Sequence, residues 1–356
     1  MYINKNMEYT IKLYTSEYFE QCADIEKYLW KEDINGRKER FLWTYHQNPN
    51  YHKCLSVIAI TSENEVVGFR GIFINKFIVG GKSELVAQIG DTVIVPKARK
   101  HGLFSKMNRY AIENLKLEGI KIVLDTGPSW TPYYGNKKLG FEDLTPITQM
   151  YNISILRILK EKLFGRENTS VKMNNIEVLN NKIVYKITDT LSDYEIENIC
   201  AMDNSDNIYS KLDYDNLKWR ISRTNKYYKF IQSFDSNGSL LSFIMLSTTD
   251  MRVYNIGLML YINRFYVEKS FSLFKRYCKP IEVLAWKPMN NSTDLKTFHK
   301  MGLFAIPLLK YIKKNPPALI YSLQNDSNGN IDWYVNGINI LDCNNWNLRK
   351  LDLDSF

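Results

Sequence analysis

The residues of this chain that are best suited to chemistry lie in a basic turn between an expected strand and an expected helix. Lys97, Arg99 and Lys100 place three positive charges just before Gly102. The first turn of a helix leaves several backbone N–H groups without partners, with a partial positive charge that attracts anions. Gly102 has no side chain to keep a phosphate away from the backbone. The pattern predicts a phosphate-binding turn, although basic turns before helices are also ordinary surface features.

A strand and a helix must hold this turn in place. Residues 85–95 read as a strand that Pro96 ends, and residues 102–118 have the apolar spacing of an amphipathic helix. Gly119 stands where a glycine commonly ends a helix. The other expected elements complete a mixed α/β unit: a helix over 18–29, strands over 56–61 and 66–73, a buried strand over 120–125, a short helix over 133–139 and a strand over 141–151.

The order of these elements resembles the GNAT acyltransferase superfamily across roughly residues 8–155. In that family the turn reads Arg/Gln-x-x-Gly-x-Gly/Ala, and Arg99, Gly102 and Phe104 stand at its defined positions. The first two match, whereas Phe104 replaces a small residue. Two further segments are similar to the family: Val95-Pro96 before the turn and Lys138-Leu139-Gly140-Phe141 after the short helix.

The resemblance implies a fold in which the strand before the turn splays from the next strand, here residues 88–95 and 120–125. The pantetheine arm of acetyl-CoA would lie in that gap, and the pyrophosphate would bind backbone N–H groups of the turn. An amine or hydroxyl of the acceptor would attack the thioester directly, and no metal is implied. The residues implied to bind the cofactor are Val93, Val95, Arg99, Lys100, His101, Gly102, Leu103, Phe104 and Asp125.

The groups that would move protons are less clearly marked. The family often places a tyrosine four residues before the glycine of Gly-Phe, and that position is Asn136 here. Tyr134 is the first candidate for protonating the leaving thiolate, and Tyr133 is its neighbour. Asp91 is a candidate general base, with Asp125 as an alternative. These tyrosines could equally be packing or acceptor-pocket residues, and both aspartates could be structural.

The second half repeats the first weakly. Leu42-Trp43 and Lys218-Trp219 each precede an expected hairpin, and Lys300-Met301-Gly302-Leu303 repeats the closing segment of the first half. The turn at residues 262–265 contains no Arg-x-x-Gly, which indicates a degenerate unit without cofactor binding. Its role would be to complete the acceptor site or a dimer. Residues that could line an acceptor pocket are Tyr209, Trp219, Arg220 and Trp286, although core packing also accounts for the tryptophans.

These patterns predict an α/β chain of two GNAT-like units, each with a mixed, splayed central sheet flanked by helices. The expected domains are an acetyl-CoA-binding domain over 1–165 and a degenerate domain over 175–356 with a C-terminal hairpin tail. The 356 residues, of which 45% are hydrophobic, suffice for two cores. The five cysteines form no Cys-x-x-Cys pair and the four histidines are scattered, so we expect no zinc site.

The net charge of +9 suits a phosphorylated cofactor or substrate, and no nucleic-acid-binding module accompanies it. No apolar run is long enough to span a membrane and the N-terminus lacks a signal-peptide layout, so we expect a cytoplasmic protein, which could form a homodimer.

The expected function is transfer of an acetyl group to a small polar acceptor, and the best single candidate is an amino sugar or sugar nucleotide of surface-polysaccharide synthesis. The alternatives are a Fem-type peptidyltransferase that uses aminoacyl-tRNA and a non-catalytic acyl-CoA sensor.

Overall fold

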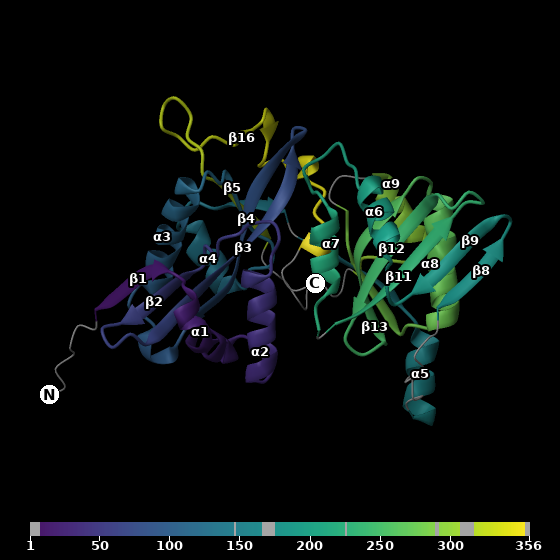
Figure 1. Ribbon diagram of the computed structural model, residues 1–356, viewed down its shortest axis with the longest axis horizontal. Coiled ribbons are helices and arrows are strands. Elements are labelled where there is room, and N and C mark those ends of the chain that lie inside the picture. Colours follow the sequence, from purple (N-terminus) through teal and green to yellow (C-terminus); the bar gives the residue numbers. More distant parts are fainter. Residues whose placement is uncertain are drawn as a thin grey trace. The chain divides into compact units, whose positions relative to one another are not determined.

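A computed structural model describes residues 8–145, 147–165, 175–224, 226–288, 292–306 and 317–352. The chain divides into two units, and each is discontinuous in sequence. The first unit contains residues 1–146 and 315–345, and the second contains residues 147–314 and 346–356. Figure 1 shows each unit as a twisted sheet with helices packed against it.

The first unit holds the elements on either side of the basic turn. In chain order they are β1 (Tyr9–Leu13), α1 (Phe19–Ile25), α2 (Ile34–Phe41), β2 (Val57–Thr61), β3 (Val66–Val79), β4 (Lys82–Ile94), α3 (Leu103–Leu117), β5 (Ile122–Asp125), α4 (Trp130–Lys137), β6 (Glu142–Thr145), β15 (Ala318–Ser322), β16 (Tyr334–Val335) and β17 (Ile338–Asn339). Short helical turns lie at Ser16–Tyr18, Glu26–Tyr28, Leu42–His46, Pro96–Ala98 and Cys343–Asn345.

The sheet of the first unit runs in the order β1-β2-β3-β4-β5-β15-β6. Neighbours from β1 to β4 are antiparallel, and β4 and β5 are parallel. The parallel step is possible because α3 carries the chain from the end of β4 back to the start of β5. Strand β15 lies antiparallel between β5 and β6. The sheet is therefore mixed, and a strand from late in the sequence completes it.

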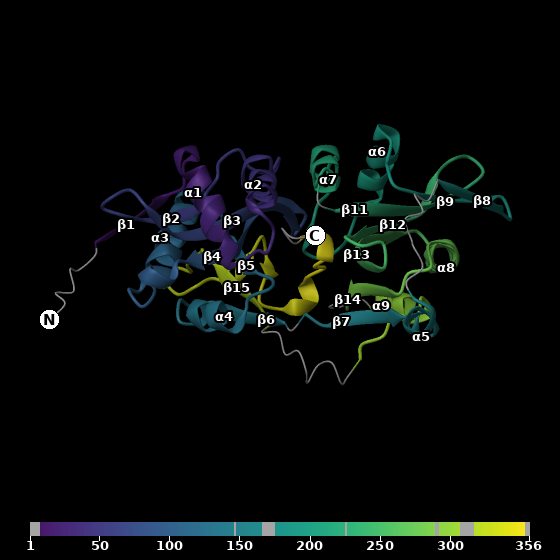
Figure 2. The same cartoon turned by 90° about the horizontal axis from the view of Figure 1, so that it is seen from below.

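Helices cover both faces of this sheet. In Figure 2, α1 and α2 lie on one side of it and α4 lies on the other. Helix α3 packs through a stripe with near four-residue spacing, so one face is buried in the core and the other meets water. The buried positions of that stripe are Leu103, Met107, Ala111 and Leu115. The helix ends at Gly119, whose φ of 73° is a left-handed conformation that glycine adopts without strain.

The second unit repeats this layout. Its elements are β7 (Gln149–Ile153), α5 (Ile155–Phe164), β8 (Ile176–Asn180), β9 (Ile183–Thr188), α6 (Asp193–Met202), β10 (Tyr209–Ser210), α7 (Tyr214–Ile221), β11 (Tyr227–Phe234), β12 (Leu240–Thr248), β13 (Val253–Tyr261), α8 (Arg264–Cys278), β14 (Glu282–Trp286), α9 (Ser292–Lys300) and a short turn at Lys350–Asp352. The sheet runs β7-β14-β13-β12-β11-β9-β8, and β13 and β14 are its parallel pair.

Most of the expected elements are confirmed, including the amphipathic helix after the basic turn. The capping box at the start of α6 is also present, because the Ser192 side chain accepts a hydrogen bond from the Glu195 N–H and the Glu195 side chain accepts one from the Ser192 N–H. The C-terminal hairpin is β16 paired with β17. The fold class, α/β with two mixed sheets, is as expected.

The single strand expected over 141–151 is wrong. It is two strands, β6 and β7, and they belong to different sheets. Since β7 leaves the first unit to pair with β14, the place beside β5 is filled by β15 instead. The division of the chain therefore differs from two consecutive domains over 1–165 and 175–356. Most of the boundary expected between those domains, residues 166–174, lies outside the described residues, and the cofactor-binding role of the first domain stays a prediction.

The position of β15 makes the stability of the first unit depend on residues near the C-terminus. Leu319 is fully buried in the core of that unit. We expect Leu319→Ala to lower the free energy of unfolding by about 2–5 kcal/mol, because it leaves a cavity in that core. Leu117→Ala is the control, since Leu117 is 84% exposed and its loss should cost less than about 0.5 kcal/mol. Urea unfolding measures both, and equal effects would contradict the place of β15 in the core.

Candidate functional site

The basic turn has the backbone shape of an anion-binding loop. A short turn at Pro96–Ala98 ends β4, after which Lys100 and Gly102 have φ values of 70° and 71°. Helix α3 begins directly afterwards, at Leu103. Residues of left-handed conformation next to a helix start turn successive N–H groups toward one side, which forms a concavity for an anion. No atom lies within 4 Å of a Cβ placed at Gly102, so the space beside it is open.

The first N–H groups of α3 are not used by a capping side chain. Gly102 stands at the N-cap and has none to offer. At the equivalent place in the second unit, the Asn263 side chain accepts a hydrogen bond of 3.0 Å from the Phe265 N–H at the start of α8. The first unit thus leaves its helix terminus available to a ligand, whereas the second fills part of it with its own side chain.

The side chains predicted to surround the turn divide into two groups. Arg99, Lys100 and His101 are exposed, and the Arg99 Nε donates a hydrogen bond of 3.0 Å to the carbonyl of Ile94. The His101 ring lies 5.5 Å from the ring of Tyr9, centroid to centroid. By contrast, the side chains of Val93, Val95 and Leu103 are buried in the core. They hold the turn in place, and only their backbone can meet a ligand.

Strands β4 and β5 separate just below this turn. Their pairing ends at Gln88 and Leu124, while β4 continues to Ile94. A β-bulge follows on β4, where Asp91 is an extra residue between two consecutive pairs with β3 and has a φ of 27°. A bulge bends a strand and interrupts its ladder. The splayed opening implied by the sequence is therefore present in the backbone.

On the face of this opening toward α3, a buried arginine gathers polar groups. Arg70 on β3 donates to the Asn108 side chain at 3.0 Å and to the Gly90 carbonyl at 3.1 Å, and it also bonds Thr92. Burial lowers the pKa of Arg70, and the charge of Asp125 acts in the opposite direction. Its Nη2 atom has no hydrogen-bond partner among the described residues. An unsatisfied buried donor is costly, so an oxygen of a ligand or of water is the natural partner.

Asn136 stands on the same side, at the position where the sequence resemblance leads one to expect a tyrosine. Its side chain is fully buried and donates a hydrogen bond of 2.8 Å to Asp125 at the end of β5. Asp125 is therefore held as an acceptor of this bond. The structure brings Asp125 together with Asn136 and Arg70; the sequence pointed to Asp125 as a site residue and to Asn136 as a replaced tyrosine, and it did not point to Arg70.

The two candidate tyrosines contact other side chains than those of this cluster. Tyr134 is 59% exposed and its ring stacks on Trp130 at 5.7 Å. The Tyr133 hydroxyl donates to the carboxylate of Asp143, and burial together with that bond raises its pKa. Since successive helical residues are turned by about 100°, Tyr134 points away from the side of α4 that carries Asn136.

Phe104 joins α3 to α4. A Cβ placed at Gly135 would lie 2.3 Å from the Cε1 atom of the Phe104 ring, so the ring rests directly on the glycine. The same ring lies 5.8 Å from the Arg70 guanidinium. The large residue at the end of the turn is thus accommodated by the missing side chain on α4. The contact changes the lining of the opening while leaving the backbone of the turn intact.

Asp91 faces the opposite side of the sheet, toward α2. Its carboxylate pairs with Arg40 at 2.7 Å and accepts hydrogen bonds from the hydroxyl of Tyr45 at 2.7 Å and from the indole of Trp30 at 3.2 Å. Arg40 also pairs with Glu26 at 2.5 Å, and all three charged side chains are at most 4% exposed. Burial raises the pKa of Glu26 to about 8, with Asp91 adding to it and Arg40 opposing it. Asp91 therefore belongs to a buried network that fixes its position.

In the second unit the corresponding parallel strands, β13 and β14, also stop pairing early, and a cavity lies beside them. The pairing of β13 and β14 ends at Asn255 and Leu284, and β13 has a bulge at Gly257. A cavity of about 460 Å³ lies beside it. Its lining includes Gly257 and Tyr261 of β13, Trp286 of β14 and Asp294 of α9. Trp286 was predicted to line such a pocket, whereas Tyr209, Trp219 and Arg220 are buried and are not among the lining residues.

The polar groups of this cavity are mostly engaged. Tyr261 donates a hydrogen bond to Asp294, whose pKa is raised by burial. Arg349 pairs with Asp203 at 2.6 Å. Lys350 donates to the Asn255 side chain at 2.5 Å, and burial lowers its pKa to about 8. Hydroxyl, carboxyl and ammonium groups beside an indole ring suit a small polar ligand. Within the described residues, no group of histidine, cysteine and acidic side chains is arranged to hold a metal.

Sequence reasoning missed Arg70, Asn108, Glu26 and Arg40. Arg70 alone carried a signal, because it is a charged residue in the otherwise apolar stretch 66–74. Buried charges need partners, so an arginine in such a strand indicates a polar cluster. Glu26 and Arg40 lie in helices that are rich in charged residues, where nothing distinguishes a buried charge from a solvated one.

Comparison with known proteins bears on the first unit directly. Residues 10–142 match the family model described as acetyltransferase (GNAT) domain. A search of the curated proteins found no match.

Solved structures resemble the chain over most of its length. One is a protein of Enterococcus faecalis described as a probable N-acyltransferase, with a TM-score of 0.62 and 12% identity, covering 89% of this chain and 73% of that one. A tandem GNAT protein from the clavulanic acid biosynthesis pathway has a TM-score of 0.55 and 10% identity, covering 90% of this chain and 100% of that one. The N-myristoyltransferase of Saccharomyces cerevisiae has a TM-score of 0.55 and 8% identity, covering 94% and 84%. At these identities the likeness concerns the fold, and it is that of two tandem GNAT-like units.

The contact between Phe104 and Gly135 can be tested by a double-mutant cycle. We expect Gly135→Ala to lower the free energy of unfolding by about 1–3 kcal/mol, because the new methyl group overlaps the ring. In a Phe104→Ala background the same change should cost less, with a coupling energy of about 0.5–3 kcal/mol. Gly127→Ala is the control, since no atom lies within 4 Å of a Cβ there. Additive effects in urea unfolding would contradict the contact.

The buried Glu26 predicts a pH dependence of stability. Its pKa is near 4.3 in an unfolded chain and about 8 in the folded protein, so between these values the folded state binds more protons. The free energy of unfolding should therefore fall as pH rises through this window, by at most about 1.4 kcal/mol per pH unit for this group.

Glu26→Gln should flatten that fall, because an amide stays neutral throughout. Urea unfolding at pH 5, 6.5 and 8 measures it, with exposed Glu63→Gln as the control. A fall as steep in Glu26→Gln as in the wild type would rule out Glu26 as its source.

Proposed function

We propose that the chain is an acetyl-CoA-dependent acyltransferase that acts on a small polar acceptor, because residues 10–142 match the family model of the GNAT acetyltransferase domain. The observation that carries the proposal is the turn before α3, where an N-cap glycine leaves the helix terminus without a capping side chain, next to the opening between β4 and β5. The first unit combines the uncapped helix terminus with the opening between two parallel strands. The second unit has kept the opening and capped its turn with Asn263.

The residues of the first unit fit the cofactor. The backbone N–H groups from Arg99 to Phe104 would hold the pyrophosphate, with Arg99 and Lys100 supplying positive charge. The exposed edge of β4 beyond Gln88, including the backbone of Val93 and Val95, would bond the pantetheine arm. Asp125 and the free Nη2 of Arg70 line the α3 face of this opening. Bound acetyl-CoA would supply the thioester that donates the acetyl group.

The chain's own residues would position the acceptor and handle its proton. Asp91 is the candidate base, and its contacts with Arg40 and Tyr45 fix the orientation of the carboxylate. Tyr133 and Tyr134 remain the candidates for protonating the leaving thiolate, although the Tyr133 hydroxyl is bonded to Asp143 and Tyr134 points away from the side of α4 that carries Asn136. Water is the simpler source.

We favour an amine or hydroxyl of an amino sugar or sugar nucleotide as the acceptor. The second unit has a cavity of its own whose chemistry suits a ligand of this class, because Trp286 gives it a flat apolar surface and Asp294, Tyr261 and Lys350 are polar groups of its lining. Trp286→Ala should then weaken the binding of a sugar nucleotide to the protein while leaving acetyl-CoA binding unchanged. An unchanged affinity for the sugar nucleotide would exclude this cavity as its binding site.

A non-catalytic acyl-CoA sensor is the second candidate. Asn136 supports it, because an amide committed to Asp125 cannot donate a proton as a tyrosine would. Both candidates bind acetyl-CoA, and only the enzyme consumes it when acceptor is present. Release of free CoA in the presence of glucosamine or a sugar nucleotide, and not in their absence, distinguishes the enzyme from the sensor.

Cofactor binding is tested first by thermal unfolding with and without acetyl-CoA. A ligand at 100 times its dissociation constant adds about 2.7 kcal/mol to stability, which raises the midpoint by several degrees. Arg99→Glu should abolish the rise because it reverses the charge at the turn. Arg109→Glu is the matched control, since Arg109 is an exposed residue of α3 outside the turn. If acetyl-CoA did not raise the midpoint of the wild type, the proposal would be contradicted. If both variants lost the rise equally, the binding of acetyl-CoA would not depend on the turn.

A further inference from the structure

Helix α5 of the second unit exposes its apolar side chains to solvent. Scattered exposed leucines are common on proteins, but a ten-residue helix with this many is not. In Figure 1, α5 projects from the second unit away from its sheet. The exposed fractions are 67% for Ile155, 83% for Leu156, 49% for Leu159, 75% for Leu163 and 81% for Phe164.

The helix is amphipathic with its apolar face outward. At about 100° per residue, Ile155, Leu159 and Leu163 form one row and Leu156 lies beside it. The opposite side carries Arg157 and Glu161, whose side chains are only 15% and 10% exposed. Glu161 pairs with Arg252 and Arg157, which ties the charged side of α5 to the rest of the unit. The orientation is the reverse of that expected for a helix packed on a core.

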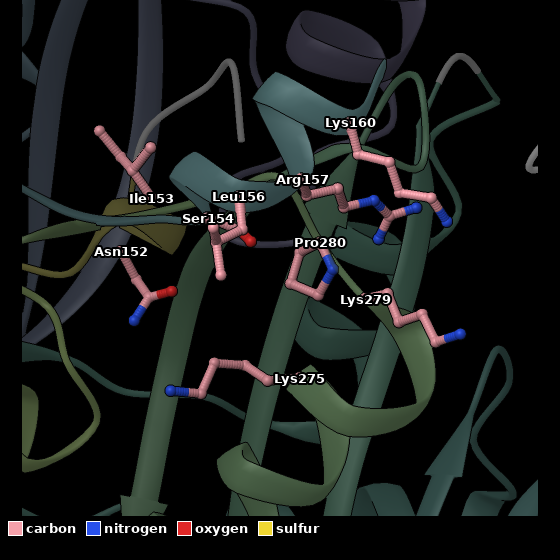
Figure 3. Close-up of a pocket in the computed structure, with 9 residues that line it drawn as sticks. All are labelled: Asn152, Ile153, Ser154, Leu156, Arg157, Lys160, Lys275, Lys279 and Pro280. Atoms are coloured by element: carbon pink, nitrogen blue, oxygen red, sulfur yellow. The ribbon is translucent and has the colours of Figure 1, made fainter. Parts of the chain in front are cut away.

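A cationic cavity lies at the foot of this apolar face. It has a volume of about 530 Å³, and its lining combines the start of α5 with the end of α8. Figure 3 shows the basic side chains around it, which are Arg157, Lys160, Lys275 and Lys279. No carboxylate is among the residues that line the cavity. Lys275 is partly buried, which lowers its pKa, and its ammonium donates a hydrogen bond of 3.2 Å to the carbonyl of Met301.

Apolar and positive groups in one place select a partner that is apolar and negative. A second copy of the chain meeting this face about a two-fold axis would bring the lysines near their own copies, which is unfavourable. A bilayer that contains anionic lipids offers acyl chains to the leucines and phosphates to the lysines. Lysine stems also lie well along a bilayer surface while their ammonium groups reach the headgroups.

We propose that α5 and the cationic cavity form a docking site for the surface of an anionic lipid bilayer. Ile155, Leu156 and Leu163 enter the boundary between headgroups and acyl chains. Lys160 and Lys279 contact lipid phosphates, and the cavity takes one headgroup. The helix lies in the interface, and none of the described helices has the length and hydrophobicity needed to cross a bilayer. The site is independent of the acetyl-CoA turn.

Sedimentation with vesicles tests this site on the full chain. We expect binding to vesicles of phosphatidylcholine and phosphatidylglycerol at 3:1, at least tenfold weaker binding to pure phosphatidylcholine, and loss of binding in 0.5 M NaCl. Leu156→Gln with Leu163→Gln should weaken binding at least tenfold, and Lys160→Gln with Lys279→Gln should do the same.

The matched control is Lys116→Gln with Leu117→Gln on α3, where both side chains are also exposed. Since all these positions are on the surface, thermal midpoints should stay unchanged, which separates docking from folding. If the wild-type protein did not sediment with the anionic vesicles, the proposal would be overturned. So would a solution dimer that the leucine variant dissociates without any effect on vesicles, because α5 would then bind a second copy.

Discussion

The early end of parallel pairing between β4 and β5 is the constraint on which the site depends. The parallel pairing ends at Gln88 of β4 and Leu124 of β5, and a bulge at Asp91 then interrupts the antiparallel ladder between β4 and β3. Beyond Gln88, β4 continues to Ile94 paired with β3 alone, which leaves its edge toward β5 without a paired strand. The same interruption recurs at Gly257 of β13. Two sheets with little sequence in common thus share a bulge beside the point where their parallel pairing ends.

The two units use this room differently. In the first, side chains occupy both faces of the opening: Arg70, Asn136 and Phe104 on one, and Asp91 with Arg40 on the other. In the second, Gly257 contributes no side chain and a cavity remains. At the helix N-termini, by contrast, the first unit is the one left open: Gly102 leaves α3 uncapped, whereas Asn263 caps α8. The proposal therefore assigns the phosphorylated cofactor to the first unit, and the second unit has a cavity of the size of a small ligand.

Local patterns predicted most of the elements, because turn residues and apolar spacing act over a few positions. They could not predict which sheet a strand joins. Residues 141–151 read as one strand since both β6 and β7 are extended, and the choice of β14 as the partner of β7 depends on contacts with residues more than 100 positions away. The turn was found because its chemistry is local, whereas the networks around Arg70 and Glu26 assemble from distant segments and left almost no trace in spacing.

Hydrogen exchange of backbone amides with and without acetyl-CoA tests the central claim most directly, because the claim concerns the N–H groups at the start of α3. Peptides that cover residues 99–105 should exchange more slowly when acetyl-CoA is present, and so should those that cover the free edge of β4. Peptides that cover residues 262–268, at the capped turn of the second unit, should be unaffected. Protection at the second turn alone, or at neither turn, would contradict the assignment of the cofactor to the first unit.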